Sequence, residues 1–278
     1  MSPGTAVLAD GRVGGVAFTV VGEGSPVTVF AHGLGGSSAE TRPLASRTPG
    51  TRVLLDFRGH GTSDPLIDGW DYDLLAEDLL TVADATGASQ AVGLSVGSGA
   101  LLRVLSRDPD RFERLAMVMP AALDEARGDG ATAAIRRLGS AIDAQDADAV
   151  TELLLAELPE EVRSRRGVSL LLGRRAAGLV TRPAPRPRRE DRPVHDRSVL
   201  SAVTAPVLVI AQEDDPLHAV GIAVELTAAL PHASLEVLPP GGVFWTAGLR
   251  TARALARHLS GDLDGAPPGR DATAGERS

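Results

Sequence analysis

A serine between two glycines is the feature of this sequence best suited to chemistry. Residues 93–97 read Gly-Leu-Ser-Val-Gly, with an apolar stretch before them and small residues opening a helical pattern after them. The G-x-S-x-G spacing lets a strand turn sharply into a helix, and it exposes the serine hydroxyl at the apex of a strained turn. The pattern therefore predicts Ser95 as a nucleophile. The structural alternative is a small residue at a tight turn.

Apolar runs and amphipathic patterns predict the elements that must position this turn. Asp10-Gly11 is a favoured hairpin turn, and it predicts an N-terminal hairpin of Val7–Ala9 and Arg12–Val21. Further strands are expected at Val27–Ala31, Val53–Asp56, Leu115–Met119, Val207–Ala211 and Leu235–Leu238, and helices at Tyr72–Ala85, Val220–Leu230 and Thr246–Leu259. This alternation predicts an α/β fold with a mostly parallel, doubly wound sheet.

The middle of the chain departs from this alternation and predicts an insertion. Residues 131–158 predict two alanine-rich helices, and the arginine- and proline-rich residues 181–197 are expected to be extended and solvated. We therefore expect a core of residues 1–120 and 198–260, an insertion of residues 121–197, and a disordered polar tail of residues 261–278.

Composition narrows the class of protein. The 278 residues carry a formal net charge of −8, which gives no support to a nucleic-acid partner, and they include no cysteine for a disulfide or a thiolate metal site. No signal peptide, membrane span, metal-ligand cluster or phosphate loop is recognised in the sequence. We expect a cytoplasmic protein that acts on a small molecule without a metal or other cofactor. The sequence gives no indication of the oligomeric state.

Four motifs, in this order, resemble those of the α/β-hydrolase fold family, in its serine-nucleophile branch, over roughly residues 5–260. They are His32–Gly36, Asp56–Asp64, Gly93–Gly97 and Val209–Pro216. The resemblance implies that the insertion is a helical cap or lid. It does not name a substrate, because the family includes esterases, lipases, thioesterases, peptidases and non-hydrolytic members.

The resemblance also implies roles for individual residues. Ser95 would attack a carbonyl carbon, and the backbone N–H groups of Leu34 and Val96 would bind the developing oxyanion. Asp215 would orient a histidine, with Asp214 as the less favoured choice. The alternative for Asp215 is a cap of the following helix, a role that is compatible with catalysis.

The family's histidine is missing from its usual loop. The stretch that resembles this loop, residues 238–245, has Val243 at the histidine position, and valine accepts no proton. His218, three residues after Asp215, is the best substitute, although a polar residue in the first turn of a helix is an alternative interpretation. The remaining histidines are expected to brace loops (His32 and His60), to belong to the arginine-rich segment (His195), or to lie on the surface (His232 and His258).

These observations leave two hypotheses for the function. The first is a serine hydrolase-like enzyme that cleaves a small ester, thioester or amide through Ser95 with a weakened or rearranged triad. The second is a non-hydrolytic protein of the same fold, namely a pseudoenzyme, a ligand binder, or an isomerase or cyclase. The presence of an imidazole nitrogen within hydrogen-bond reach of Ser95 Oγ distinguishes them.

Overall fold

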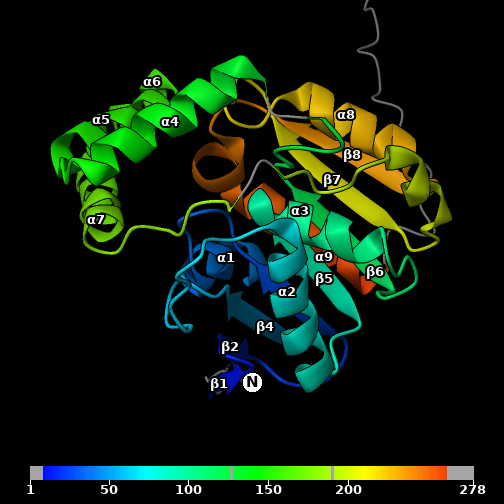
Figure 1. Ribbon diagram of the computed structural model, residues 1–278. Helices are drawn as coiled ribbons and strands as arrows, with labels where there is room; N and C mark the ends of the chain where they lie inside the picture. Colours follow the sequence, from blue (N-terminus) through cyan, green and yellow to red (C-terminus); the bar gives the residue numbers. More distant parts are fainter. Residues whose placement is uncertain (1–8, 126–127, 189–190, 262–278) are drawn as a thin grey trace, which may run out of the picture.

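Eight strands form one open sheet in the computed structural model, which describes residues 9–125, 128–188 and 191–261. The strand order is β1-β2-β4-β3-β5-β6-β7-β8 (Figure 1). Strands β1 and β2 run antiparallel to their neighbours, and β3 to β8 run parallel to one another. The strands are β1 (Ala9–Val13), β2 (Val16–Val21), β3 (Val27–Ala31), β4 (Thr51–Asp56), β5 (Gln90–Leu94), β6 (Arg114–Val118), β7 (Val207–Gln212) and β8 (Ala233–Leu238).

Helices cover both faces of the sheet, and each face has its own apolar core. One core includes residues of α2 (Tyr72–Thr86), α3 (Val96–Leu105) and α8 (Val220–Ala229). The other includes residues of α1 (Ser38–Ala45) and α9 (Gly248–Ser260). All five residues of β5 are buried, as expected for a strand at the centre of such a sheet. The predicted fold class, a mostly parallel and doubly wound α/β sheet, is confirmed.

The N-terminal hairpin forms, but its turn is not where the sequence predicted it. Gly14 and Gly15 join β1 to β2 with φ angles of 55° and 82°, and Val13 pairs with Val16. A two-residue turn with positive φ at both central positions matches the twist of the strands, and glycine adopts it without strain. Asp10 and Gly11 therefore lie inside β1, and the prediction of a turn there was wrong.

The insertion between β6 and β7 contains more helix than the sequence predicted. It consists of α4 (Asp129–Asp143), α5 (Ala147–Ala156), α6 (Glu160–Arg163) and α7 (Val168–Thr181), and we call residues 129–181 the helical insertion. The insertion has an apolar cluster of its own, which includes Val150, Leu154, Leu172 and Leu179. Helices α6 and α7 were not predicted, although Val168, Leu172, Ala176 and Leu179 follow helical spacing.

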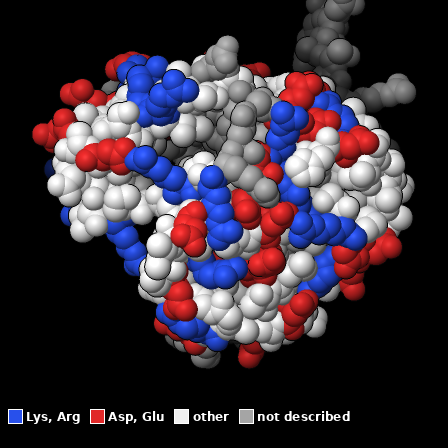
Figure 2. Space-filling model, viewed as in Figure 1, with Lys and Arg blue, Asp and Glu red and all other residues white. Residues whose placement is uncertain are grey.

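The arginine- and proline-rich segment after α7 fits the predicted extended, solvated conformation only in its first half. Residues 182–188 form no helix and are mostly exposed, whereas residues 191–197 pack against the core, and for them the prediction was wrong. Val194 is buried in the core, and Asp191 accepts a hydrogen bond at 3.0 Å from Arg103, a buried residue of α3. Arg197 forms ion pairs with Asp124 at 2.6 Å and with Glu225 at 2.8 Å. A buried guanidinium needs charged and carbonyl partners, and the segment supplies them. On the face shown in Figure 2, arginines and acidic residues are interspersed.

The sequence predicted a disordered tail of residues 261–278. Residues 262–278 of this tail lie outside the described residues. Among the helices that the structure describes, none is long and apolar enough to cross a membrane.

Candidate active site

Ser95 lies at the turn between β5 and α3, in a backbone conformation that non-glycine residues rarely adopt. Its φ angle is 53° and its ψ angle is −109°, and its N–H donates to the carbonyl of Val118 at 2.9 Å. A strained residue between a strand and a helix presents its side chain above the carboxyl end of the sheet. This is the geometry that the G-x-S-x-G pattern predicts.

The two glycines of the motif are required by close backbone contacts. A Cβ atom at Gly93 would lie 2.5 Å from the carbonyl carbon of Gly97, and one at Gly97 would lie 2.5 Å from the carbonyl oxygen of Ala31. Such contacts are far shorter than real Cβ atoms make. The glycines therefore allow the turn to pack against itself and against β3.

His218 lies between the serine and a carboxylate and forms a hydrogen bond to each. Its Nε2 is 2.9 Å from Ser95 Oγ, and its Nδ1 is 3.0 Å from Asp215 Oδ1. Because a carboxylate accepts hydrogen bonds, we assign the ring proton to Nδ1, which leaves Nε2 free to accept the Ser95 hydroxyl proton. The structure thus connects Ser95, His218 and Asp215 in one hydrogen-bonded chain.

Asp215 also closes the turn that carries His218. Its Oδ1 accepts hydrogen bonds from the backbone N–H groups of Leu217, at 2.8 Å, and His218, at 3.0 Å. Although burial alone raises it, the pKa of Asp215 is lowered by the hydrogen bond and charge of His218 and by these two N–H groups. The same atom, Asp215 Oδ1, therefore both caps the turn and holds the His218 ring in place. Asp214, with a φ angle of 54°, is exposed and lies outside this chain of hydrogen bonds.

Leu34 and Val96, whose backbone N–H groups are expected from the sequence to bind an oxyanion, both line the cavity at Ser95. Val96 is the first residue of α3, so its N–H has no partner within the helix. The loop that carries Leu34 is held by Glu40, whose Oε2 accepts a hydrogen bond from Gly33 N–H at 3.1 Å. Among the described residues, no hydrogen bond from Leu34 N–H is found. The sequence did not lead us to Glu40, although its place three residues after Ser37 matches a capping box.

His32 and His60 brace the loops beside the site, as the sequence predicted. His32 Nδ1 donates to the carbonyl of Gly33 at 2.7 Å, and its Nε2 accepts from Phe57 N–H at 3.0 Å. His60 contacts the His32 ring at a centroid distance of 5.0 Å, and its Nδ1 is 3.3 Å from the carbonyl of Arg58. Burial lowers the pKa of both histidines, and the two rings therefore stay neutral.

We expect the His60 ring to make the protein less stable in mild acid. Burial, with a smaller contribution from the charge of His32, lowers the pKa of His60 from 6.5 to about 4. Between pH 6.5 and about pH 4 the folded protein binds fewer protons than the unfolded chain. The contribution of the neutral ring to the free energy of unfolding is therefore fully present above pH 6.5, and it is lost as the pH falls towards 4. Urea unfolding should show a loss of about 2 kcal/mol from this ring between about pH 7.5 and pH 5.

The control is His60→Gln, which removes the titration and should show a smaller loss of stability over the same interval. Comparing the two losses cancels the contributions of the other titrating groups. If the free energy of unfolding falls equally in both proteins, the lowered pKa of His60 is not the cause of the loss.

Val243 lies in the loop where the sequence led us to expect a histidine, and its side chain does not face Ser95. The residue is 1% exposed, packs in the core on the α9 side of the sheet, and donates its N–H to Gln212 Oε1 at 3.1 Å. It belongs to a single π-helical turn, η2 (Gly242–Thr246). The neighbouring Phe244 and Trp245 face the cavity, but Val243 does not. In this chain the imidazole comes from the loop after β7.

The remaining histidines do not approach Ser95. His195 Nε2 is 3.3 Å from Arg103 Nη1, and His232 is exposed, as predicted. His258 was expected on the surface, and that prediction was wrong, because the residue is 4% exposed and its Nε2 donates to the carbonyl of Leu115 at 2.8 Å. A histidine on the buried face of α9 can satisfy its ring proton with a strand carbonyl.

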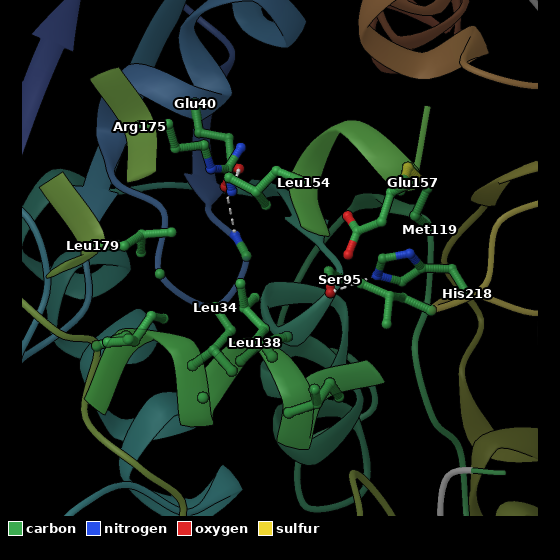
Figure 3. Close-up of a pocket in the computed structure, with 18 of the residues that line it drawn as sticks. Leu34, Glu40, Ser95, Met119, Leu138, Leu154, Glu157, Arg175, Leu179 and His218 are labelled. Carbon is green, nitrogen blue, oxygen red and sulfur yellow. Dashed lines mark hydrogen bonds and ion pairs between the residues drawn. The ribbon is translucent and has the colours of Figure 1, made fainter. Parts of the chain in front are cut away.

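A cavity of about 540 Å³ opens above Ser95, between the sheet and the helical insertion. Most of its lining is apolar, and Figure 3 shows leucines of the loop after β3 and of the helical insertion around it. Trp245 and Phe244 close another part of the wall. A cavity of this volume accommodates a drug-sized ligand. Among the described residues, no cluster of three or more metal-ligating side chains occurs.

Glu157 is a member of this cavity that the sequence did not single out. It follows α5 directly, and its carboxylate points towards Ser95 and His218 (Figure 3). A glutamate at the end of an amphipathic helix is usually solvated, so no sequence signal distinguished it.

The comparisons with known proteins agree with this fold. The sequence model described as "alpha/beta hydrolase fold" matches residues 26–133. Non-heme chloroperoxidase CPO-A1 of Kitasatospora aureofaciens is 38% identical over 106 residues, which are 36% of this chain and 38% of that protein. The chain spans less than half the length of the first curated relatives that it matches.

Solved structures match almost the whole chain. Carboxylesterase CesB of Bacillus subtilis aligns over 93% of both chains with a TM-score of 0.74 and 19% identity. Serine hydrolase CCSP0084 of Cycloclasticus zankles aligns over 94% of this chain and 100% of that chain, with a TM-score of 0.73 and 16% identity. The protein therefore has the α/β-hydrolase fold, with a helical insertion between β6 and β7.

Proposed function

We propose that this protein is a serine hydrolase that cleaves a small ester, thioester or amide with an apolar acyl group. The observation that carries the proposal is the hydrogen-bonded chain from Ser95 through His218 to Asp215, at 2.9 and 3.0 Å. Relatives named as an esterase and as a carbamate hydrolase support the same reaction class. In this proposal the triad is rearranged rather than degenerate, because its base is three residues beyond its acid.

The reaction follows from the positions of the polar atoms. His218 Nε2 accepts the Ser95 hydroxyl proton while Oγ attacks the carbonyl carbon of the substrate. The N–H groups of Leu34 and Val96 stabilise the oxyanion, and Asp215 stabilises the imidazolium. His218 then gives its proton to the leaving group, and a water molecule, activated by the same ring, releases the acid from the acyl-enzyme.

The lining of the cavity suggests the acyl group. Leu34, Leu138 and Leu179 lie on the side of Ser95 away from His218, where they surround the space that an acyl chain would fill (Figure 3). Burying one CH₂ group stabilises a complex by about 0.8 kcal/mol, so medium-chain esters are better substrates than acetates. In this proposal the helical insertion acts as a cap over a small-molecule site.

Labelling with a fluorophosphonate tests the nucleophile. We expect one covalent adduct per chain, on the peptide that contains Ser95, and no adduct in Ser95→Ala. The same pair of proteins should differ by a factor on the order of 10⁶ in kcat for an alkyl hexanoate, because serine and base act as one unit.

Two outcomes would contradict the proposal. An adduct that persists in Ser95→Ala would identify a different nucleophile. If a folded sample gives no adduct and no hydrolysis of esters from acetate to dodecanoate, the fold serves a non-hydrolytic function. As a matched control, Ser98→Ala removes a buried hydroxyl that donates to the Gly93 carbonyl at 2.8 Å, and it should still be labelled.

A further inference from the structure

Among the residues that the structure describes, the carboxylate of Glu157 has no partner. The side chain is half-buried, and no described residue lies within hydrogen-bond or ion-pair distance of its oxygens. In Figure 3 it reaches down from the helical insertion to the His218 side of Ser95, opposite the Leu34 loop. A carboxylate held in an apolar cavity without a partner is costly for the protein alone. A ligand that supplies a partner would recover that cost.

The other charged groups of the cavity are already paired or exposed. Arg175 is 3.1 Å from Glu40, His218 is 3.0 Å from Asp215, and Arg186 forms an ion pair with Asp143. Arg136 is exposed on α4, where water screens its charge. Among the charged groups of the described cavity lining, Glu157 is therefore the half-buried one that a ligand can still neutralise.

The side of Ser95 on which Glu157 lies defines the part of the substrate it meets. The oxyanion would form towards the N–H groups of Leu34 and Val96, and the acyl chain would occupy the leucine-lined side. The leaving group must then lie near His218 Nε2, which donates a proton to it. Glu157 is directed at this same region (Figure 3).

We propose that Glu157 is a specificity-determining residue that binds a positively charged amine on the leaving group of the substrate. This inference rests on the proposed function, and it deepens it by naming the substrate class: esters of amino alcohols, or related acyl compounds whose leaving group carries a cationic amine. A cationic amine on the leaving group supplies the opposite charge to the carboxylate, and it leaves the apolar acyl subsite unchanged.

Protonation of Glu157 gives this preference a pH dependence. Burial, together with the negative charge of Asp215, raises the pKa of Glu157 to about 7, and the charge of Arg175 partly opposes the rise. The charges that act on it are those of Asp215 and Arg175, and the other charged or titratable groups that line the same cavity are Glu40, Arg136, Asp143, Arg186 and His218. The carboxylate is ionised above this pKa, so the preference for a cation increases with pH.

Two esters of the same shape test the proposal. Choline hexanoate and 3,3-dimethylbutyl hexanoate differ in one atom, a positively charged nitrogen in place of a carbon. We expect kcat/KM to favour the choline ester about tenfold at about pH 8.5 and hardly at all at about pH 5.5, since one favourable charge contact changes affinity on this scale. The charge of choline does not change with pH, so a change in the ratio of the two kcat/KM values reflects the ionisation of a group on the protein.

Glu157→Gln should bring the ratio of the two kcat/KM values close to one at both pH values. Glu152→Gln is the matched control, because Glu152 is an exposed residue of α5, the helix that Glu157 follows, and the substitution should leave the ratio unchanged. A wild-type ratio close to one at high pH would overturn the proposal. So would a Glu157→Gln protein that slows both esters equally and keeps the preference.

A binding measurement separates this proposal from the hydrolase itself. Hexyltrimethylammonium should bind to the Ser95→Ala protein, and adding Glu157→Gln should raise its dissociation constant about tenfold. If the wild type hydrolyses no ester but this binding persists and depends on Glu157, the hydrolase proposal fails and the cation subsite stands. Binding that does not depend on Glu157 overturns the cation subsite.

Discussion

Replacing His218 with alanine is expected to lower kcat for an alkyl hexanoate by a factor on the order of 10⁶, the loss that removal of the base causes in subtilisin. The reason is that His218 Nε2 is 2.9 Å from Ser95 Oγ and that no other described histidine approaches this oxygen. The stability of the variant should change little, because among the described residues the ring forms hydrogen bonds with Ser95 and Asp215 alone. Steady-state kinetics and a thermal melt of the same sample measure both effects.

His232→Ala is the matched control, since this exposed histidine lies on the turn before β8. It should keep the wild-type kcat. Adding Val243→His to the His218→Ala protein should not restore hydrolysis, because Val243 is buried in the core away from the cavity. A His218→Ala protein with wild-type activity, or recovery through Val243→His, would show that the base belongs on the later loop.

Asp215→Ala is expected to lower kcat by a factor on the order of 10⁴, as loss of the triad acid does in subtilisin. The imidazolium that forms during the reaction loses its stabilising negative charge, and the turn that carries His218 loses its acceptor. The hydrogen bonds from Leu217 and His218 N–H to Asp215 Oδ1 also predict a loss of stability of about 1 kcal/mol.

Asp215→Asn separates the two roles of this side chain. An asparagine oxygen can still accept the two backbone N–H groups, so the melting temperature should stay near that of the wild type. The amide is neutral, and kcat should still fall at least about 10²-fold. Wild-type kinetics in Asp215→Asn would mean that the residue only closes the turn. Asp214→Asn, at the exposed neighbouring position, should have no effect on kcat.

Local sequence patterns were enough to predict the central elements of the fold. The buried strands β3, β4 and β7, the helix α2 that ends at Gly87, and the elbow around Ser95 all follow from short-range patterns. These are apolar runs, a helical repeat, and glycines at positions where backbone approaches backbone. The misplaced hairpin turn shows the limit, because Asp10-Gly11 and Gly14-Gly15 are both good local turns. Only the pairing of β1 and β2 selects the second.

The same limit applies to the candidate site. The G-x-S-x-G pattern was enough to place Ser95 at a strand-to-helix turn, and spacing after an apolar strand indicated Asp215 and His218. Folding brings the His218 ring, 123 residues from Ser95 along the chain, to 2.9 Å from the Ser95 hydroxyl, and it buries the Val243 side chain in the core; no local pattern indicates either result. Glu157 had no sequence signal, because a glutamate at a helix end becomes unusual only when folding places it in an apolar cavity. Short-range patterns fix the conformation of a segment, but long-range packing fixes which side chains meet.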